Sequence, residues 1–145
     1  MKNILLGLAS LLLLVCACTR KPDTTTEYSL LPIPQSMHIA DGSFTIGKGT
    51  KLYIDAPADD RHAISNAFAA WDDIAVTDKN TATNCISMTV CDTIEGLSSP
   101  EGYTINVGKD KITVKATSGA GLFYAAQTLQ QLANGGNSIP VCTIT

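Results

Sequence analysis

The sequence has few charged residues, few aromatic residues and no excess of basic ones. Charged residues make up 16% of the 145, and ten Lys and Arg against thirteen Asp and Glu give a formal net charge of −3. A mildly acidic chain gives no reason to expect a nucleic-acid partner, because phosphate binding needs concentrated positive charge. One Trp, four Tyr and three Phe also leave little material for a sugar-stacking platform, since most of them fall within expected helices and strands.

Residues that bind metals are also scarce. His38 and His62 are the two histidines, and neither has an acidic or cysteine partner at a ligand spacing, so we expect surface residues rather than catalytic bases. Cys85, Cys91 and Cys142 lack the short paired spacing of a zinc site. Cys85 and Cys91 would lie about 20 Å apart on one strand and could not pair. Cys142 could pair with Cys85 or with Cys91 if their strands are neighbours in a sheet. The favoured interpretation is that all three are buried free thiols. We therefore predict no metal and no cofactor.

Two further motifs favour structural explanations. Asp72 and Asp73 are adjacent carboxylates, but no apolar setting separates their protonation, so they predict a solvated surface rather than a general acid and base. Ser-Gly-Ala-Gly at 118–121 follows an expected strand and begins an expected helix, as dinucleotide loops do. Tyr124 stands where the third glycine of such a loop is required. We therefore expect these glycines to let the helix start sit tightly against a sheet.

The first eighteen residues have the layout of an export signal. Lys2 precedes an apolar run at 4–15, which is short for a membrane span of about 20 residues. Val15-Cys16-Ala17-Cys18 resembles the lipobox of bacterial lipoproteins, in which a cysteine is lipidated and becomes the first residue. Cys18 is the better candidate, because bulky Val15 would stand directly before Cys16. A signal peptide cut without lipidation is the alternative.

These features predict three segments. Residues 1–17 form a lipoprotein signal peptide, residues 18–28 a polar tether, and residues 29–145 a single folded domain. A lipid anchor would hold the exported protein on a membrane of the bacterial cell envelope, on the periplasmic side or the outer-membrane surface.

The clearest fold signal lies in residues 100–133. Apolar residues alternate with polar ones at 103–107 and 112–116, and the turn residues at 108–111 join these two expected strands into a hairpin. Ser118 can cap a helix that Asn134-Gly135-Gly136 ends. Its apolar residues recur at three- and four-residue steps: Leu122, Ala125, Ala126, Leu129 and Leu132.

The remaining elements complete a mixed fold. Asp59 or Asp60 can cap a first helix, whose apolar stripe is Ile64, Ala67, Phe68 and Trp71. Short strands are expected at 51–54, 86–90 and 139–144, and residues 37–40 and 44–46 are expected to pair as a hairpin through Asp41-Gly42. The predicted fold class is an α+β, or α/β, sandwich: a mixed β-sheet with two helices packed on one face.

Two segments carry a family resemblance. Residues 100–133, PEGYTINVGKDKITVKATSGAGLFYAAQTLQQLA, resemble the end of the amino-terminal accessory domain of glycoside hydrolase family 20, the β-N-acetylhexosaminidases. Leu31-Pro-Ile-Pro-Gln-Ser-Met37, followed by Gly42-Ser-Phe-Thr-Ile46, resembles the opening of the same domain. The resemblance covers residues 29–145. It implies a zincin-like sandwich that packs against a catalytic barrel and supports it.

The resemblance also implies where the chemistry resides. In that family the substrate's own acetamido oxygen attacks the anomeric carbon, a Glu protonates the leaving oxygen, and the Asp before it orients the acetamido group. This sequence has no Asp-Glu dipeptide, and a barrel needs about 250 residues. We therefore expect a non-catalytic domain of an exported β-N-acetylhexosaminidase, without the barrel and without a catalytic residue. The alternatives are a stand-alone lipoprotein that binds glycans or a protein partner, and the accessory domain of another barrel glycosidase.

Overall fold

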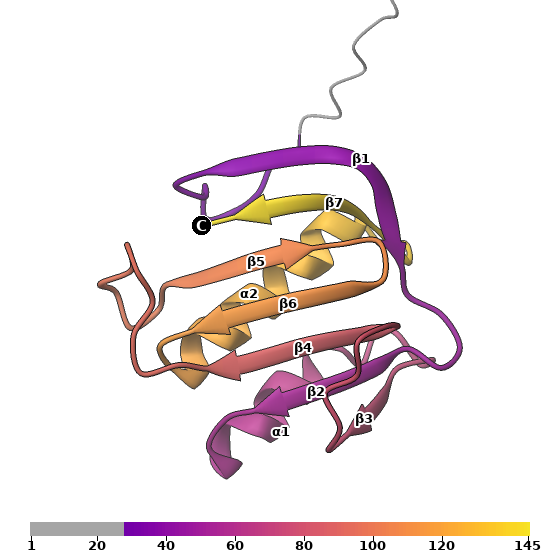
Figure 1. Ribbon diagram of the computed structural model, residues 1–145, viewed down its shortest axis with the longest axis horizontal. Coiled ribbons are helices and arrows are strands. Elements are labelled where there is room, and N and C mark those ends of the chain that lie inside the picture. The colour runs from indigo at the N-terminus through magenta and orange to yellow at the C-terminus, as the bar shows by residue number, and fades with distance from the viewer. Residues whose placement is uncertain (1–27) are drawn as a thin grey trace, which may run out of the picture.

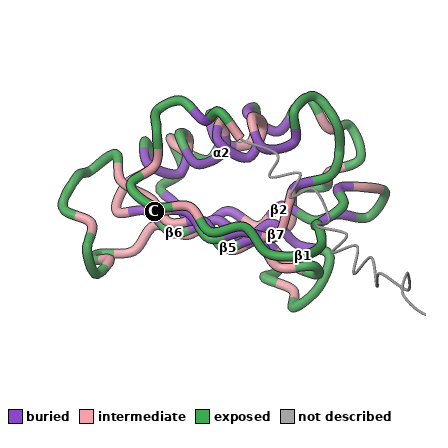
Figure 2. The backbone as a smooth tube through the Cα atoms, turned by 90° about the horizontal axis from the view of Figure 1, so that it is seen from above, coloured by how far each residue is buried: buried purple, intermediate pink, exposed green. Residues whose placement is uncertain are grey.

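A computed structural model describes residues 28–145. The predicted signal peptide, Cys18 and all but the last residue of the predicted tether lie outside the described residues. In the described part, two helices cover one face of a single seven-stranded sheet (Figures 1 and 2). The predicted sandwich is thereby confirmed.

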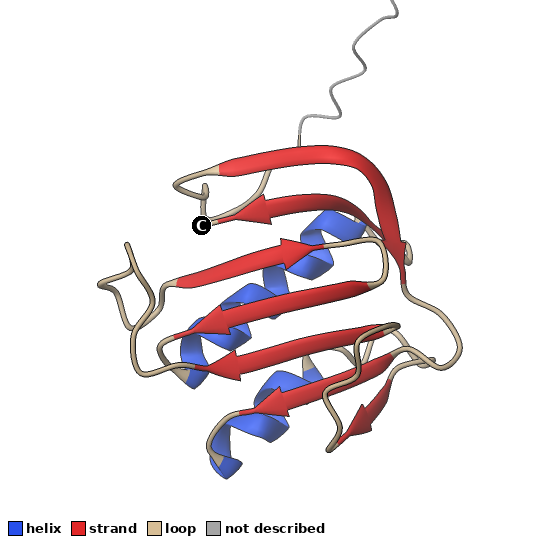
Figure 3. Ribbon diagram, in the orientation of Figure 1, coloured by secondary structure: helices blue, strands red, loops and turns tan. Residues whose placement is uncertain are grey.

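The sheet has the strand order β1-β7-β5-β6-β4-β2-β3. Neighbouring strands are antiparallel from β1 to β6, while β6, β4, β2 and β3 run parallel. Figure 3 shows these strands in red with both helices behind them. The strands are β1 (Met37–Thr45), β2 (Lys51–Asp55), β3 (Ala75–Thr77), β4 (Cys85–Val90), β5 (Tyr103–Val107), β6 (Lys111–Ala116) and β7 (Ser138–Ile144), and the helices are α1 (Ala58–Asn66) and α2 (Gly119–Ala133).

The core lies between the sheet and the helices. One cross-strand row on the helix side consists of buried Ile54, Met88, Val114, Ile105 and Ile144. Along each strand, apolar residues alternate with polar ones. Because successive side chains point to opposite faces of the sheet, the polar neighbours of these five residues lie on the other face. The β5–β6 hairpin and the buried stripe of α2 are therefore confirmed.

Strand β4 departs from simple alternation, because Cys85, Ile86, Ser87 and Met88 are all buried. Parallel strands inside a sheet are commonly covered on both faces. Here the β3–β4 loop passes in front of β2 in Figure 1, and the Lys111 ammonium donates a 2.5 Å hydrogen bond to Asn80 Oδ1 in that loop.

Both ends of α2 follow the sequence signals. The Ser118 side chain accepts a 3.2 Å hydrogen bond from the Gly121 backbone N–H, and Asn134 ends the helix in the left-handed conformation with φ 47°. The N-cap serine satisfies one of the free N–H groups of the first turn. The left-handed residue closes the last turn.

The first helix differs from the prediction at both ends. Pro57 is its N-cap residue and makes no side-chain capping bond, so Asp59 and Asp60 lie inside the first turn and neither is the cap. Proline presets the backbone angle of a helix start, and acidic residues in the first turn favour the helix dipole. The helix ends at Asn66, whereas Ala67 and Phe68 stay buried in the turns that follow.

The hairpin predicted within residues 37–46 is wrong. Met37–Thr45 forms one strand, β1, which pairs with β7 along its length, and the register shifts between Ile39 and Ser43. Gly42 adopts φ 108° at this irregularity. The Asp41-Gly42 turn signal therefore produces a local break within an edge strand, where two extra residues are accommodated without reversing the chain.

The three cysteines within residues 28–145 are free. Cys85 and Cys142 are buried and Cys91 is half-buried. Cys85 on β4 and Cys142 on β7 are separated by two intervening strands, or about 14 Å at the usual strand spacing, so they cannot bridge. Burial raises the pKa of the Cys142 thiol to about 11, which keeps it protonated at ordinary pH.

Candidate functional site

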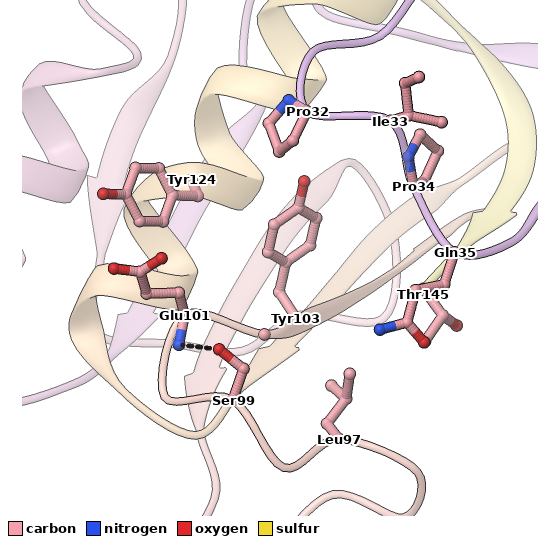
Figure 4. Close-up of a pocket in the computed structure, with 11 residues that line it drawn as sticks. Pro32, Ile33, Pro34, Gln35, Leu97, Ser99, Glu101, Tyr103, Tyr124 and Thr145 are labelled. Carbon is pink, nitrogen blue, oxygen red and sulfur yellow. Dashed lines mark hydrogen bonds between the residues drawn. The ribbon is translucent and has the colours of Figure 1, made fainter.

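An apolar cleft opens beside the first turns of α2. Its volume is about 360 Å³. Figure 4 shows its three walls: the segment before β1, the start of α2, and the loop that leads into β5. The lining residues are Pro32, Ile33, Pro34, Gln35, Leu97, Ser99, Glu101, Gly102, Tyr103, Tyr124 and Thr145.

The first wall is a strap, residues 31–36, that hydrogen bonds hold at both ends. The Gln131 side chain on α2 accepts a 2.8 Å bond from the Leu31 N–H and donates a 2.8 Å bond to the Leu31 carbonyl. At the other end Ser36 and Thr145 exchange backbone bonds of 3.0 and 3.1 Å. The strap is held through these bonds, and its Leu31 and Ile33 side chains are 71% and 84% exposed.

Tyr103 forms the floor of the cleft. Its ring rises from the first residue of β5 toward Pro32 (Figure 4). The Tyr103 hydroxyl lies 2.6 Å from Thr128 Oγ1 on α2, and Thr128 is buried. This contact between two hydroxyl groups joins the sheet to the helix at the bottom of the cleft.

The third wall is the loop at residues 97–102, which is fastened to the start of α2. The Ser118 hydroxyl donates to the Pro100 carbonyl, and the Thr117 hydroxyl donates a 3.3 Å bond to the Ser99 carbonyl. Gly121 permits this approach, because a Cβ there would lie 2.7 Å from the Gly102 carbonyl oxygen and 2.8 Å from Ala116 Cβ. This confirms the expectation that glycine lets the helix start lie against the sheet.

The cleft offers little for acid–base chemistry. Glu101 has the one carboxylate side chain among the lining residues, it is exposed, and no histidine lines the cleft. General acid–base hydrolysis of a glycosidic bond needs two groups held on either side of that bond. The cleft is therefore suited to apolar contact rather than to proton transfer.

The other candidate residues lie apart from the cleft and from one another. His38 is exposed on β1, and His62 is exposed on α1, where its Nε2 lies 3.2 Å from Asn66 Nδ2. Asp72 and Asp73 are exposed between α1 and β3. Within residues 28–145 no three His, Cys, Asp or Glu side chains cluster as metal ligands would, and no helix has the length and apolarity of a membrane span.

A comparison with protein families decides the affiliation of the chain. Residues 27–145 match the family model described as glycosyl hydrolase family 20, domain 2. The chain belongs to this family. The resemblance seen in the two sequence segments is therefore confirmed, although a search of the curated proteins gave no match.

Solved structures of family 20 enzymes share the fold. The β-N-acetylhexosaminidase of Bacteroides fragilis superposes with a TM-score of 0.65 at 24% identity, over 79% of this chain and 24% of the enzyme. The N-acetyl-β-hexosaminidase of Streptomyces plicatus gives 0.66 at 23% identity, over 79% and 25%. The chitobiase of Flavobacterium johnsoniae gives 0.61 at 26% identity, over 79% and 20%. The chain thus spans about a quarter of the length of these enzymes or less.

The floor of the cleft in this family 20 domain allows a specific test. We expect Tyr103→Phe to lower the free energy of unfolding by about 1–2 kcal/mol, because the buried Thr128 hydroxyl loses its partner. Urea denaturation followed by circular dichroism measures the difference. Tyr124→Phe is the matched control, since Tyr124 is 40% exposed and its hydroxyl can bond to water. Equal stability of the two variants would show that the Tyr103–Thr128 contact contributes nothing.

Proposed function

We propose that this domain is the non-catalytic domain 2 of an exported β-N-acetylhexosaminidase, and that it supports the catalytic barrel of that enzyme. The match of residues 27–145 to family 20, domain 2 carries the proposal. Two further observations support it. The sequence has no Asp-Glu dipeptide, and Glu101 has the one carboxylate side chain among the lining residues of the cleft.

An activity assay tests the non-catalytic role. The 145-residue chain is purified and incubated with an aryl N-acetyl-β-glucosaminide, with the Bacteroides fragilis enzyme as the positive control. We expect no release of the aryl group above the blank, because a single exposed carboxylate side chain cannot supply both roles that hydrolysis requires. Turnover comparable to that of the control enzyme would refute the proposal.

Export and lipid anchoring at Cys18 form the second part of the proposal. We expect Cys18→Ala to move the protein from the membrane fraction to the soluble fraction of a bacterial host, because the acyl chains have no attachment point. Cys16→Ala is the matched control and should stay in the membrane fraction. The measurement is immunoblotting of the two fractions, with mass spectrometry of the mature amino terminus. Loss of anchoring in Cys16→Ala alone would place the lipid on the other cysteine.

A binding role is the second candidate, and the tyrosines of the cleft favour it. Tyr124 is 40% exposed beside Tyr103 in an apolar cleft of about 360 Å³, and aromatic rings in such clefts can hold ligands. Titration calorimetry with chito-oligosaccharides separates the two functions. Heat that saturates with the wild-type chain and is lost in Tyr124→Ala would favour a glycan-binding module.

A further inference from the structure

Asn134 and Gly135 lie in the exposed turn that joins α2 to β7. Asparagine followed by glycine is especially prone to deamidation, because glycine has no side chain to shield its backbone nitrogen or to restrict its rotation. Asn134 is exposed with φ 47°, and Gly135 follows with φ 76°. Beyond its chain neighbours, no atom lies within 4 Å of the position that a Cβ on Gly135 would take. The approach of the Gly135 nitrogen to the Asn134 side chain is therefore unobstructed.

The Gly135 N–H is available for this approach. Within residues 28–145 it has no hydrogen-bond acceptor, although the N–H groups on both sides of it are bonded. The Asn134 N–H donates to two carbonyls in the last turn of α2 at 3.2 and 3.1 Å, and the Gly136 N–H donates to the Ala133 carbonyl at 2.8 Å. Because no hydrogen bond has to be broken first, the Gly135 nitrogen can turn toward a side chain at little cost.

Two other exposed asparagines each lack at least one of these features. Asn84 has the same left-handed backbone, with φ 49°, but its side-chain oxygen accepts a 2.8 Å bond from the Thr50 hydroxyl and a buried cysteine follows it. Asn66 ends α1, and the N–H that follows it, that of Ala67, donates to helix carbonyls at 3.3 and 3.2 Å. The sequence has a single Asn-Gly dipeptide, at Asn134. The two features meet at this position.

We propose that Asn134 is a site of spontaneous deamidation and that isoaspartate is its main product. The Gly135 nitrogen loses its proton and attacks Asn134 Cγ, the Cγ–Nδ2 bond breaks, and the amino group leaves with a proton as ammonia. The product is a cyclic succinimide, which a water molecule then opens. Opening at the main-chain carbonyl carbon of Asn134 leaves the chain running through Cβ and Cγ, which is isoaspartate. Opening at Cγ gives ordinary aspartate.

The modification would break a contact between two parts of the fold. Trp71 Nε1 donates a 2.9 Å hydrogen bond to the Gly136 carbonyl, and this bond fastens the segment after α1 to the α2–β7 turn. The far end of the turn is fixed, because the Asn137 carbonyl accepts a 2.7 Å bond from the Ile46 N–H. Isoaspartate inserts a methylene carbon into the main chain between α2 and this fixed end. The Gly136 carbonyl must then shift, and Trp71 loses its acceptor.

Peptide mapping tests the site. The 145-residue chain is incubated at physiological temperature in water enriched in heavy oxygen, so that deamidation during the incubation is labelled, and its peptides are then analysed by mass spectrometry. We expect Asn134 to react first, with isoaspartate exceeding aspartate, while Asn66 and Asn84 stay largely intact at the time when half of Asn134 has reacted. Equal conversion at the three positions, or no conversion at Asn134, would overturn the proposal.

The emission of Trp71, the one tryptophan of the chain, tests the structural consequence. We expect it to shift to longer wavelength in step with isoaspartate formation, because the indole loses its hydrogen bond and becomes more exposed to water. Asn134→Gly is the matched variant, since glycine accepts the left-handed conformation at a helix end and has no amide to lose. Its emission should stay constant during the same incubation. An aged wild-type chain with unchanged emission would overturn the release of Trp71.

Asn134→Asp separates charge from chain length. Freshly prepared, this variant has the negative charge of the products at the carboxyl end of α2, where the helix dipole disfavours it, but its main chain is not lengthened. We expect its Trp71 emission to match that of the fresh wild-type chain and its unfolding midpoint to be lower. An emission shift equal to that of the aged wild-type chain would show that charge, and not the inserted methylene carbon, releases Trp71.

Discussion

Leu129→Ala is expected to lower the free energy of unfolding by about 2–5 kcal/mol. Leu129 is completely buried on the inward side of α2. Truncation removes apolar surface from the core and leaves a cavity that close-packed neighbours cannot fill. A small domain has about 5–15 kcal/mol of stability in total, so this single change should bring it near the unfolding threshold. Urea denaturation followed by circular dichroism at 25 °C gives the difference.

Gln127→Ala is the control for this prediction. Gln127 lies on the same helix, but its side chain is only half-buried on the outward side, and a surface change to a good helix former should alter stability by no more than about 0.5 kcal/mol. Similar losses in both variants would mean that the stability of α2 does not come from packing on the sheet.

The second large effect is expected at Gly121. Alanine there would place its Cβ 2.7 Å from the Gly102 carbonyl oxygen and 2.8 Å from Ala116 Cβ, and neither atom belongs to a flexible side chain that can move away. Overpacking of this kind costs about 1–3 kcal/mol. The higher helix propensity of alanine, about 1 kcal/mol, offsets part of the loss. Thermal unfolding by calorimetry should therefore show a clearly lower midpoint for Gly121→Ala.

Gly47→Ala is the matched control, since no atom lies within 4 Å of the Cβ it would add. The same added methyl group should leave stability unchanged or slightly raise it by restricting the unfolded chain. An unfolding midpoint for Gly121→Ala at or above that of Gly47→Ala would show that α2 tolerates a larger separation from the sheet.

The sequence predicts residues 100–133 in full because every signal there is local. The β5–β6 turn, the Ser118 cap and the Asn134 ending are all encoded within a few residues of the structures they form. Alternation and helical spacing then point both elements at the same core. Local and tertiary preferences agree, which is the condition under which a pattern can be interpreted from sequence alone.

The errors arise where the pairing partner is distant. In β1 the Asp41-Gly42 signal favours a hairpin, but Ile39 pairs with Cys142 and Phe44 with Ile139 on β7, about a hundred residues away. Long-range pairing on the sheet outweighs the local turn preference. In α1 the aspartates are plausible caps, but the N-cap residue is Pro57, two residues before Asp59 and three before Asp60.

The cleft could not be predicted from spacing, because its lining residues come from four separate parts of the sequence. Ile33, Leu97, Tyr124 and Thr145 meet only once the sheet order and the Gln131 bonds to the strap are known. One signal was nevertheless available. The helix at 119–133 has no charged residues, and the distant segment at 31–36 is apolar and rich in proline. Both features indicate surfaces that are covered rather than exposed to water.

The outermost strands also affect how this protein behaves at high concentration. An unpaired strand edge is a template on which another molecule can add its own strand, which is the first step of aggregation. Here β3 provides only three residues for such pairing, and β1 has its register shift between Ile39 and Ser43. Within residues 28–145, neither edge of the sheet presents a long regular row of backbone groups, so this sheet is protected at both sides against fibrous self-assembly.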